Sequence, residues 1–531
     1  RPLGQSTSSS QILYVYCSCF ILYLLFTAYA TRGVILDTMS KRTSFVLRAT
    51  QVVSIILLAL AAIFIIASQY KQAQFGGSKF DEIVFYIRNG MGDGRSENFQ
   101  LAALQHLPWA IGLCILFLLP LIDRFRRAVY RVGRAIGQRL RRRSSSPTTE
   151  AAPSQSASRR YFRWRYKFLY ASLIFLASGW YLLQTFEVPA YIQALTQSTK
   201  LYETHYVDPK TAHLTFPAKK RNLVYIYMES MENSLLSKAH GGQADSSIIP
   251  ELEQIALHHT NFSHTQSGIG GALPATGTTW TVGGMAAQSG GVPLKETFAG
   301  GRDHNSLGDF DKFLPGAYTS GDIFKQQGYN QTFIMGSSAK FGGRDKLLSQ
   351  HGSYQIQDHQ YALDHKQLPS ANYKVWWGYE DKKLFTFARQ EATRLAEQDK
   401  PFNLQLLTAD THFTDGYLDE TCKTPHQQQY DNVYACSSKQ VAEFVKWLQQ
   451  QPFAANTTIV LSGDHLGMQT DYYQKKITSP TFQRTVYHAF INPAVTPTNS
   501  HNRLFSTMDM YPSTLAALGV TIKGERLGLG T

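Results

Sequence analysis

The sequence predicts an α/β sandwich with a mostly parallel sheet, preceded by a bundle of about four transmembrane helices. All long apolar stretches lie before residue 190. From Asn222 onward, short apolar runs alternate with longer amphipathic stretches, which is typical of an α/β sandwich. No internal repeat with a period of about 20 to 50 residues is evident, which argues against solenoids and propellers. We therefore expect a membrane anchor over residues 1–190 and one globular domain over residues 191–531.

Four stretches in the anchor are apolar and long enough to cross a bilayer, which takes about 20 residues as a helix. They are Ile12–Ala30, Val52–Ile66, Leu107–Ile122 and Phe168–Thr185. Buried helices of a soluble core are the alternative. The clustering of all four stretches at one end of the chain argues against that alternative.

The formal net charge of +14 is concentrated in one segment. The segment from Arg124 to Lys167 holds 14 Lys or Arg and a single acid, Glu150. Such local charge argues against a nucleic-acid-binding protein, and positively charged loops stay in the cytoplasm. We therefore expect residues 123–167 to form a cytoplasmic loop and the chain after residue 190 to lie outside the cytoplasmic membrane. Contact of the first arginines with anionic lipid is a second role open to this loop.

The globular domain is expected to contain at least five buried strands. They are Leu223–Met228, Thr332–Met335, Asn403–Leu407, Thr458–Leu461 and Val486–Ile491. Three stretches with helical spacing follow or separate them, namely Lys382–Gln398, Gln427–Gln450 and Ser506–Leu518. In such folds, ligands bind beyond the carboxyl ends of the strands.

Only two cysteines, Cys422 and Cys436, lie in the expected extracytoplasmic domain. A disulfide between them suits an oxidising compartment and would close a short loop. Two free thiols remain the alternative.

Two of the expected strands run directly into residues that can bind a metal. Glu229 ends the first strand in LVYIYMESMENS, and Asp464 and His465 follow the fourth in TTIVLSGDHLGM. Carboxylate oxygens and an imidazole nitrogen suit zinc, manganese or a similar divalent cation. Each residue taken alone also fits a capping or solvent-exposed role.

A glycine- and threonine-rich segment, GIGGALPATGTTWTVGGMAAQSGGVPL, supplies hydroxyl groups where a helix can begin. A hydroxyl at a helix N-terminus can attack a phosphate held there, if a metal lowers its pKa and cations stabilise the transition state. Arg344 and His412 follow other expected strands and are candidates to contact phosphate oxygens. A flexible loop and ordinary surface residues are the alternatives.

In this order, the segments resemble the alkaline phosphatase and sulfatase superfamily, in the branch of lipoteichoic acid synthases and bacterial phosphoglycerol transferases. TTWTVGGMAAQSGGVPL is similar to the nucleophile segment of the transferases that modify osmoregulated periplasmic glucans. In that segment a threonine follows a tryptophan and precedes a Gly-Met step and a later Gly-x-Pro-Leu. The resemblance implies Thr281 as the nucleophile, with Thr278 and Thr279 as less favoured candidates.

The resemblance also implies the remaining site. Glu229, Thr281, Asp464 and His465 match the metal ligands, whereas Arg344 and His412 match residues that bind the substrate. The cofactor would be one divalent metal ion, manganese first, with magnesium or zinc as alternatives. Asp509 matches a family position near the last helix, although a capping role at that helix fits as well.

The chain departs from related patterns at several positions. Gly342 stands where lipoteichoic acid synthases have a tryptophan two residues before the arginine. Thr281 is not followed by the x-Pro-x-Arg that sulfatases need for formylglycine formation, so sulfate ester hydrolysis is not expected. Phosphoethanolamine transferases have several exported disulfides, whereas this chain has one cysteine pair there.

The resemblance implies an enzyme of the bacterial inner membrane with its catalytic domain in the periplasm. It would transfer phosphoglycerol from phosphatidylglycerol to a periplasmic glucan or related glycan through a phospho-threonine intermediate, releasing diacylglycerol. A phosphoethanolamine transferase or a lipoteichoic acid synthase-like polymerase would use the same chemistry with other partners. A catalytically silent periplasmic sensor or scaffold is the alternative from a different class.

Overall fold

The computed structural model describes residues 41–74, 158–196, 199–294 and 312–531, together with isolated positions between 80 and 119. The chain divides into two compact units. One contains helices α2 (Lys41–Gln74) and α6 (Ser158–Thr185), and the other contains the globular domain from Tyr191 to Thr531.

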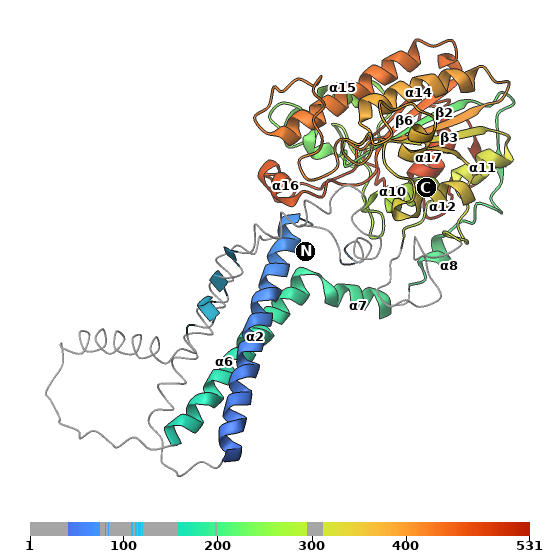
Figure 1. The fold of residues 1–531 in the computed structure, drawn as a ribbon. Helices are drawn as coiled ribbons and strands as arrows, with labels where there is room; N and C mark the ends of the chain where they lie inside the picture. The colour runs from blue at the N-terminus through green and yellow to red at the C-terminus, as the bar shows by residue number, and fades with distance from the viewer. Residues whose placement is uncertain are drawn as a thin grey trace. The chain divides into compact units, whose positions relative to one another are not determined.

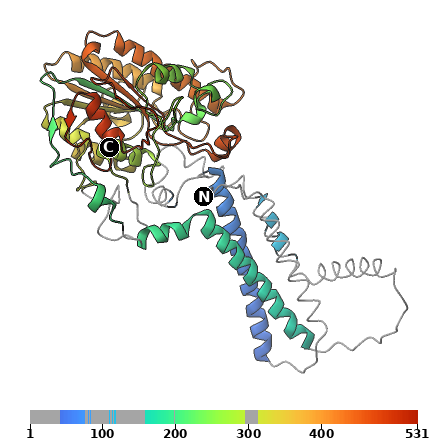
Figure 2. The ribbon, with the colours of Figure 1, turned by 180° about the vertical axis from the view of Figure 1, so that it is seen from behind.

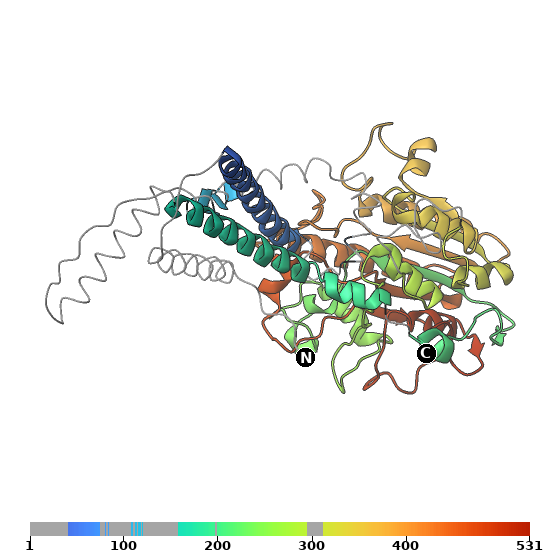
Figure 3. The same cartoon turned by 90° about the horizontal axis from the view of Figure 1, so that it is seen from below.

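Helices α2 and α6 run side by side in all three views (Figures 1, 2 and 3). Their contact is apolar: Leu58 and Ala62 of α2 and Ala171 of α6 are buried in one cluster. The rings of Phe64 and Phe175 lie 5.4 Å apart. Small alanines at the contact allow the two helix backbones to approach closely.

Two segments of these helices, Ala49–Gln72 and Tyr166–Thr185, are apolar and long enough to cross a membrane. Only 28% and 22% of their most apolar windows is buried, which is unlike the core helix of a soluble protein. They contain the predicted stretches Val52–Ile66 and Phe168–Thr185. The predicted stretch Ile12–Ala30 lies outside the described residues, as do half of Leu107–Ile122 and most of the basic loop 123–167, so the four-helix bundle stays a prediction.

A six-stranded sheet with the order β4-β3-β5-β2-β6-β7 forms the centre of the globular domain. The strands are β2 (Asn222–Met228), β3 (Asn330–Met335), β4 (Gln355–Gln357), β5 (Phe402–Leu407), β6 (Thr457–Gly463) and β7 (His488–Ile491). All neighbouring pairs are parallel except β6 and β7. The predicted mostly parallel sheet is therefore confirmed.

The register places the carboxyl ends of the central strands level with one another. Met228 at the end of β2 pairs with Gly463 at the end of β6, and Tyr227 pairs with Leu407 at the end of β5. Whatever follows these three strands emerges at the same edge of the sheet. In parallel sheets this edge is where ligands bind.

Helices cover both faces of the sheet, so the domain is an α/β/α sandwich (Figures 1 and 2). Three lie on one face, α9 (Pro250–His258), α14 (Asp381–Ala396) and α15 (Gln429–Gln449), and four on the other, α10 (Thr281–Gly290), α11 (Ser320–Gln326), α12 (Arg344–Gln350) and α17 (Met510–Ala517). Side chains of β2 alternate between these layers. Val224 and Ile226 join the core formed with α14 and α15, whereas Tyr225 donates a hydrogen bond to Gln288 of α10 over 2.7 Å.

The remaining elements are short, and the first of them, α7 (Val188–Thr196), crosses the boundary between the two units. The others are α8 (Leu201–His205), α13 (His359–Asp364), α16 (Thr470–Lys476) and an antiparallel pair, β1 (Leu214–Thr215) with β8 (Thr521–Ile522).

Several predicted boundaries differ from the structure by two residues or more. The last helix begins at Met510 rather than at Ser506, because the carboxylate of Asp509 accepts the Ser506 backbone N–H over 2.6 Å and holds those residues in a turn. Asp509 also accepts the Thr531 backbone N–H over 2.7 Å, and it makes no capping bond to its own helix. The last strand begins at His488 rather than at Val486.

Cys422 and Cys436 form a disulfide, with their Cα atoms 5.6 Å apart. Cys436 lies on α15, and Cys422 lies in the segment that precedes this helix. The bond ties that segment to the helix.

Candidate functional site

Three side chains of types that could hold a metal ion meet at the carboxyl ends of β2 and β6. Glu229, Asp464 and His465 are buried, and one ligand atom of each lies within 4.8 Å of the others. The Nε2 atom of His465 lies 3.4 Å from Glu229 Oε1 and 3.4 Å from Asp464 Oδ2. The level ends of the two strands bring these residues together although more than 230 positions separate them along the chain.

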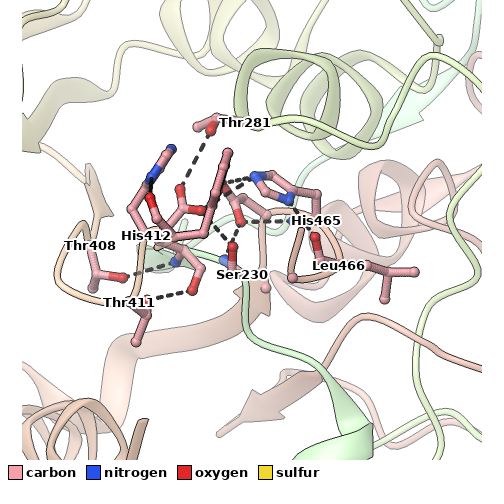
Figure 4. A network of polar contacts seen from close by, with 12 residues as sticks. Ser230, Thr281, Thr408, Thr411, His412, His465 and Leu466 are labelled. Carbon is pink, nitrogen blue, oxygen red and sulfur yellow. Dashed lines mark hydrogen bonds and ion pairs between the residues drawn. The ribbon is translucent and has the colours of Figure 1, made fainter. Parts of the chain in front are cut away.

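Ser230 orients both carboxylates (Figure 4). Its backbone N–H donates to Asp464 Oδ1 over 2.8 Å, and its hydroxyl donates to Glu229 Oε1 over 2.7 Å. To make both bonds the residue adopts a φ of +54°, in the left-handed region that costs a non-glycine residue about 1 kcal/mol or more. Each carboxylate is left with one oxygen to present to a ligand.

The imidazole of His465 is fixed in one tautomer. Its Nδ1 lies 2.7 Å from the carbonyl oxygen of Leu466 and must donate a proton to it (Figure 4). In the neutral ring the lone pair is then on Nε2, which faces the two carboxylates. In metal sites, a hydrogen bond from the other ring nitrogen to a carbonyl oxygen orients the histidine ligand in this way.

The chemistry of this cluster fits a divalent cation. Burial, and next the charge of Asp464, raise the pKa of Glu229 well above its usual range. Within the described part of the chain, Asp464 Oδ2 and His465 Nε2 are buried without a hydrogen-bond partner. Each such group costs about 1 to 3 kcal/mol. A cation bound between these atoms would satisfy both and would offset the proximity of two carboxylates.

Thr281 is the first residue of α10, and its hydroxyl lies beside the cluster. The Oγ1 atom donates to Glu229 Oε2 at 3.5 Å (Figure 4). A Cβ atom added to Gly284 would lie 2.0 Å from the carbonyl oxygen of Asp464, so only glycine allows α10 to dock this closely. Gln288 secures the same helix by donating to the Gly463 carbonyl over 2.9 Å.

The alternative threonine Thr278 has a structural role. Its hydroxyl donates to the Ala275 carbonyl over 2.9 Å and lies 3.2 Å from the hydroxyl of Thr507. Thr278 is fully buried in this turn, whereas Thr281 is only partly buried.

Arg344 begins α12 and is buried near the cluster. Its guanidinium donates to the carbonyls of Ser338 and Phe341 over 2.7 and 3.0 Å and lies over the Phe341 ring. Burial lowers the pKa of Arg344 to about 10, against the opposite effect of the Glu229 and Asp464 charges, so the group stays cationic at neutral pH. It therefore adds positive charge to the site.

His412 lies in the loop after β5, and this loop is bonded to the backbone of Glu229. Thr408 accepts the Glu229 N–H over 2.9 Å, and Thr411 donates to the Glu229 carbonyl over 2.6 Å (Figure 4). The ring of His412 donates from Nδ1 to the Phe413 carbonyl over 2.8 Å and packs on Trp377, with centroids 4.2 Å apart. The indole N–H of Trp377 is buried and has no hydrogen-bond partner among the described residues.

Two buried carboxylates, those of Asp381 and Asp410, form hydrogen bonds that join this loop to the start of α14. Asp381, at the start of α14, accepts the backbone N–H groups of Ala409 and Asp410 over 2.8 and 3.1 Å, and Asp410 accepts that of Asp381 over 3.2 Å. Burial raises the pKa of Asp381 to about 7. Burial, and next the charge of Asp381, raise the pKa of Asp410.

Sequence reasoning missed Ser230, the Asp381–Asp410 pair and a buried ion pair between Glu232 and Arg484. Ser230 and Glu232 stand in the polar run ESMENS after β2, which was a usable signal. Arg484 lies in an irregular segment with no local pattern that marks it.

Comparisons with known proteins agree with the predicted resemblance. The profile of the Sulfatase family matches residues 221–520, more than half of the chain. Phosphoglycerol transferase I of Escherichia fergusonii is 32% identical over 275 residues, which cover 50% of this chain and 33% of that protein. Phosphoglycerol transferase I of Citrobacter koseri is 32% identical over 278 residues, with the same coverage. The chain thus matches only about a third of the length of these relatives.

Among solved structures, lipoteichoic acid synthase LtaP from Listeria monocytogenes superposes with a TM-score of 0.46 at 16% identity, covering 61% of this chain and 79% of that one. This score is too low to add to the family match. The resemblance to bacterial phosphoglycerol transferases is confirmed by the curated relatives. Since the family profile spans the six-stranded sheet, the cluster of Glu229, Asp464 and His465, and Thr281, the chain belongs to the sulfatase family.

Proposed function

We propose that this protein is a membrane-anchored phosphoglycerol transferase. It would take phosphoglycerol from phosphatidylglycerol, release diacylglycerol, and pass the group to a periplasmic glucan or related glycan. The observation that carries the proposal is the hydroxyl of Thr281 at the start of α10, beside the buried cluster of Glu229, Asp464 and His465. In this cluster Asp464 Oδ2 and His465 Nε2 accept no hydrogen bond from any residue that the structure describes. The identity to proteins named phosphoglycerol transferase I supports the choice of the transferred group.

Glu229, Asp464, His465 and Thr281 are the proposed ligands of one divalent metal ion, manganese first, with magnesium or zinc as alternatives. When bound, such an ion supplies Lewis acidity that lowers the pKa of a hydroxyl group bound to it. Ser230 and Leu466 keep the ligand atoms directed at one point.

The transfer is proposed to take two steps. Thr281 Oγ1 loses its proton and attacks the phosphorus of the donor, so that a bond from threonine oxygen to phosphorus forms and the bond to the diacylglycerol oxygen breaks. Diacylglycerol leaves as a neutral alcohol after it takes up a proton. A sugar hydroxyl then attacks the same phosphorus and loses its proton, the bond from phosphorus to the threonine oxygen breaks, and that oxygen takes up a proton, which restores Thr281. Arg344 and His412 are proposed to neutralise the phosphoryl oxygens in both steps.

If the donor is a lipid, the apolar helices have the role of anchoring the enzyme at the membrane that contains the donor. The span-length segment Tyr166–Thr185 is joined to the globular domain by a short stretch of chain. The domain is thereby kept at the membrane surface, where lipid headgroups are exposed. We place it on the periplasmic side of a bacterial inner membrane, since residues 123–167 carry the positive charge expected of a cytoplasmic loop.

A phosphoethanolamine transferase or a lipoteichoic acid synthase-like polymerase would use the same site with another donor or acceptor. A catalytically silent scaffold is less consistent with the site, because it would have no use for the buried Asp464 Oδ2 and His465 Nε2 atoms, which have no hydrogen-bond partner in the described part of the chain.

The test is diacylglycerol release by the purified full-length protein from liposomes of phosphatidylglycerol or phosphatidylethanolamine, with manganese or with chelator. Metal-dependent release from phosphatidylglycerol is expected, and Thr281→Ala should lower it by at least about 1000-fold because the nucleophile is gone. Thr276→Ala, an exposed threonine of the same segment, is the matched control and should keep its activity. Release from phosphatidylethanolamine alone would move the assignment to that transferase, and release from neither lipid would overturn the proposal.

A further inference from the structure

A buried ion pair lies close to the metal-binding cluster but contributes no ligand to it. Glu232 is fully buried three residues after Glu229, and Arg484 reaches it from the segment that precedes β7. Arg484 Nε donates to Glu232 Oε1 over 2.9 Å, and its Nη2 contacts the other carboxylate oxygen. The guanidinium also lies over the ring of Tyr473, 4.1 Å from its centroid.

The two residues of the ion pair form hydrogen bonds with both backbone polar groups of Gly467. Glu232 Oε2 accepts the Gly467 backbone N–H over 2.9 Å, and Arg484 donates to the Gly467 carbonyl over 2.6 Å. This segment directly follows His465. Two charge-assisted bonds therefore fix the backbone immediately after a proposed metal ligand.

A single peptide group connects the ion pair to the imidazole. The N–H that Glu232 accepts belongs to the same planar peptide unit as the Leu466 carbonyl, and that carbonyl receives the Nδ1 proton of His465 over 2.7 Å. In a trans peptide the N–H and C=O point in opposite directions. Holding the N–H therefore fixes the direction of the carbonyl, and with it the tautomer and the plane of the imidazole.

The geometry points to Glu232 and Arg484 as positioning residues that hold His465 ready for a divalent cation. Glu232 sets the peptide group, and Arg484 compensates the charge of Glu232 inside the protein. This inference rests on the proposed role of His465 as a metal ligand. Outer hydrogen-bond partners of this kind change metal affinity by about 10- to 100-fold when they are removed.

The test is isothermal titration calorimetry of manganese, and separately of zinc, into the purified full-length protein. We expect Glu232→Gln to weaken manganese binding by about 10- to 100-fold, because the amide cannot both pair with Arg484 and hold the peptide N–H in place. Arg484→Lys should weaken it by less, since a charge remains. Melting temperatures of the metal-free proteins are measured beside each titration.

Glu253→Gln is the matched control. Glu253 is also buried, accepts the Ser237 backbone N–H over 2.7 Å and contacts His240, but it has no bond to the cluster. This variant should bind manganese as the unaltered protein does. Equal affinity in Glu232→Gln and Glu253→Gln would overturn the inference, as would a lower melting temperature of Glu232→Gln with unchanged affinity.

If Glu232→Gln does not fold, Arg484→Lys decides: weaker manganese binding at an unchanged melting temperature supports the inference, and unchanged binding contradicts it. Because affinity is measured without substrate, these outcomes are independent of the transferase reaction. Intact manganese binding without diacylglycerol release would contradict the proposed function alone.

Discussion

Ser230 combines two hydrogen bonds to the cluster with a strained backbone conformation. It gives one hydrogen bond to each carboxylate of the cluster, and it does so in a backbone conformation that only glycine adopts without cost. The strain sits at the point where β2 ends and the ligands begin. Strained residues of this kind persist where the surrounding structure requires them.

Two substitutions at Ser230 separate the strain from the hydrogen bond. Ser230→Ala and Ser230→Gly both lose the hydroxyl that orients Glu229, so both should lose transferase activity, by about 10-fold or more. Glycine relieves the positive φ, so Ser230→Gly should be more stable than Ser230→Ala by about 1 kcal/mol. Thermal melting of the two metal-free variants measures this difference. Equal melting temperatures would argue against strain at this position.

The loop after β5 depends on the start of α14. The carboxylates of Asp381 and Asp410 accept each other's backbone N–H groups and hold the segment that carries His412. Both carboxyl groups have raised pKa values, with burial as the main cause. The folded protein therefore binds protons here that the unfolded chain releases.

This pair predicts a pH dependence of stability. The pKa of Asp381 is higher in the folded protein than in the unfolded chain. The contribution of the pair to the free energy of unfolding is therefore largest below about pH 4 and is lost as the pH rises through about 7. Asp410→Asn keeps an acceptor for the Asp381 N–H and removes one of the two charges. We expect its melting temperature to exceed that of the unaltered protein by roughly 5 °C at about pH 8, with little difference at about pH 5. The same difference in melting temperature at both pH values would show that ionisation of one carboxylate does not disfavour ionisation of the other.

The elements differed in how well their sequences predicted them. β2 and β6 were predicted to within two residues because they are continuous apolar runs buried on both faces. β4 was missed because its three residues, Gln355–Gln357, include two glutamines and give no apolar run. The start of α17 was misplaced because the bond from Ser506 to Asp509 turns the chain before the helix begins.

The candidate site was also predicted in part from the sequence. Polar residues directly after parallel strands were expected to meet at one edge, and the structure brings Glu229, Asp464 and His465 together there. The bonds of Ser230 to Asp464 and of Glu232 to Arg484 were not predicted. The strand pattern predicts which segments meet at this edge, but it does not specify which polar side chains within them form hydrogen bonds.

At the scale of the whole molecule, the two compact units differ in where their apolar side chains lie. One contains apolar helices whose side chains are largely exposed, and the other has a core of its own around the sheet. Exposed apolar helices are stable in lipid rather than in water. The exposed apolar helices therefore support the membrane anchor proposed above.

Cysteine labelling tests this topology in intact cells. In a protein with Cys17, Cys19 and Cys114 replaced by alanine, we expect Val495→Cys, 52% exposed on the globular domain, to react with a membrane-impermeant maleimide. Ser145→Cys, in the basic loop, should react only after the cells are lysed. The opposite pattern would place the globular domain in the cytoplasm and would rule out the periplasmic assignment.

The matched register of the central strands restricts how this protein can change in length. Glu229 and Asp464 each stand one residue beyond a paired strand end, Met228 beside Gly463. One residue inserted within β2 would move Glu229 by about 3.3 Å and turn it to the opposite face of the sheet, and no neighbouring strand could restore it. Insertions and deletions should therefore accumulate in the connecting segments and be excluded from β2 and β6. Changes in the connecting segments can then alter what surrounds the candidate site, while the spacing between Glu229 and Asp464 stays the same.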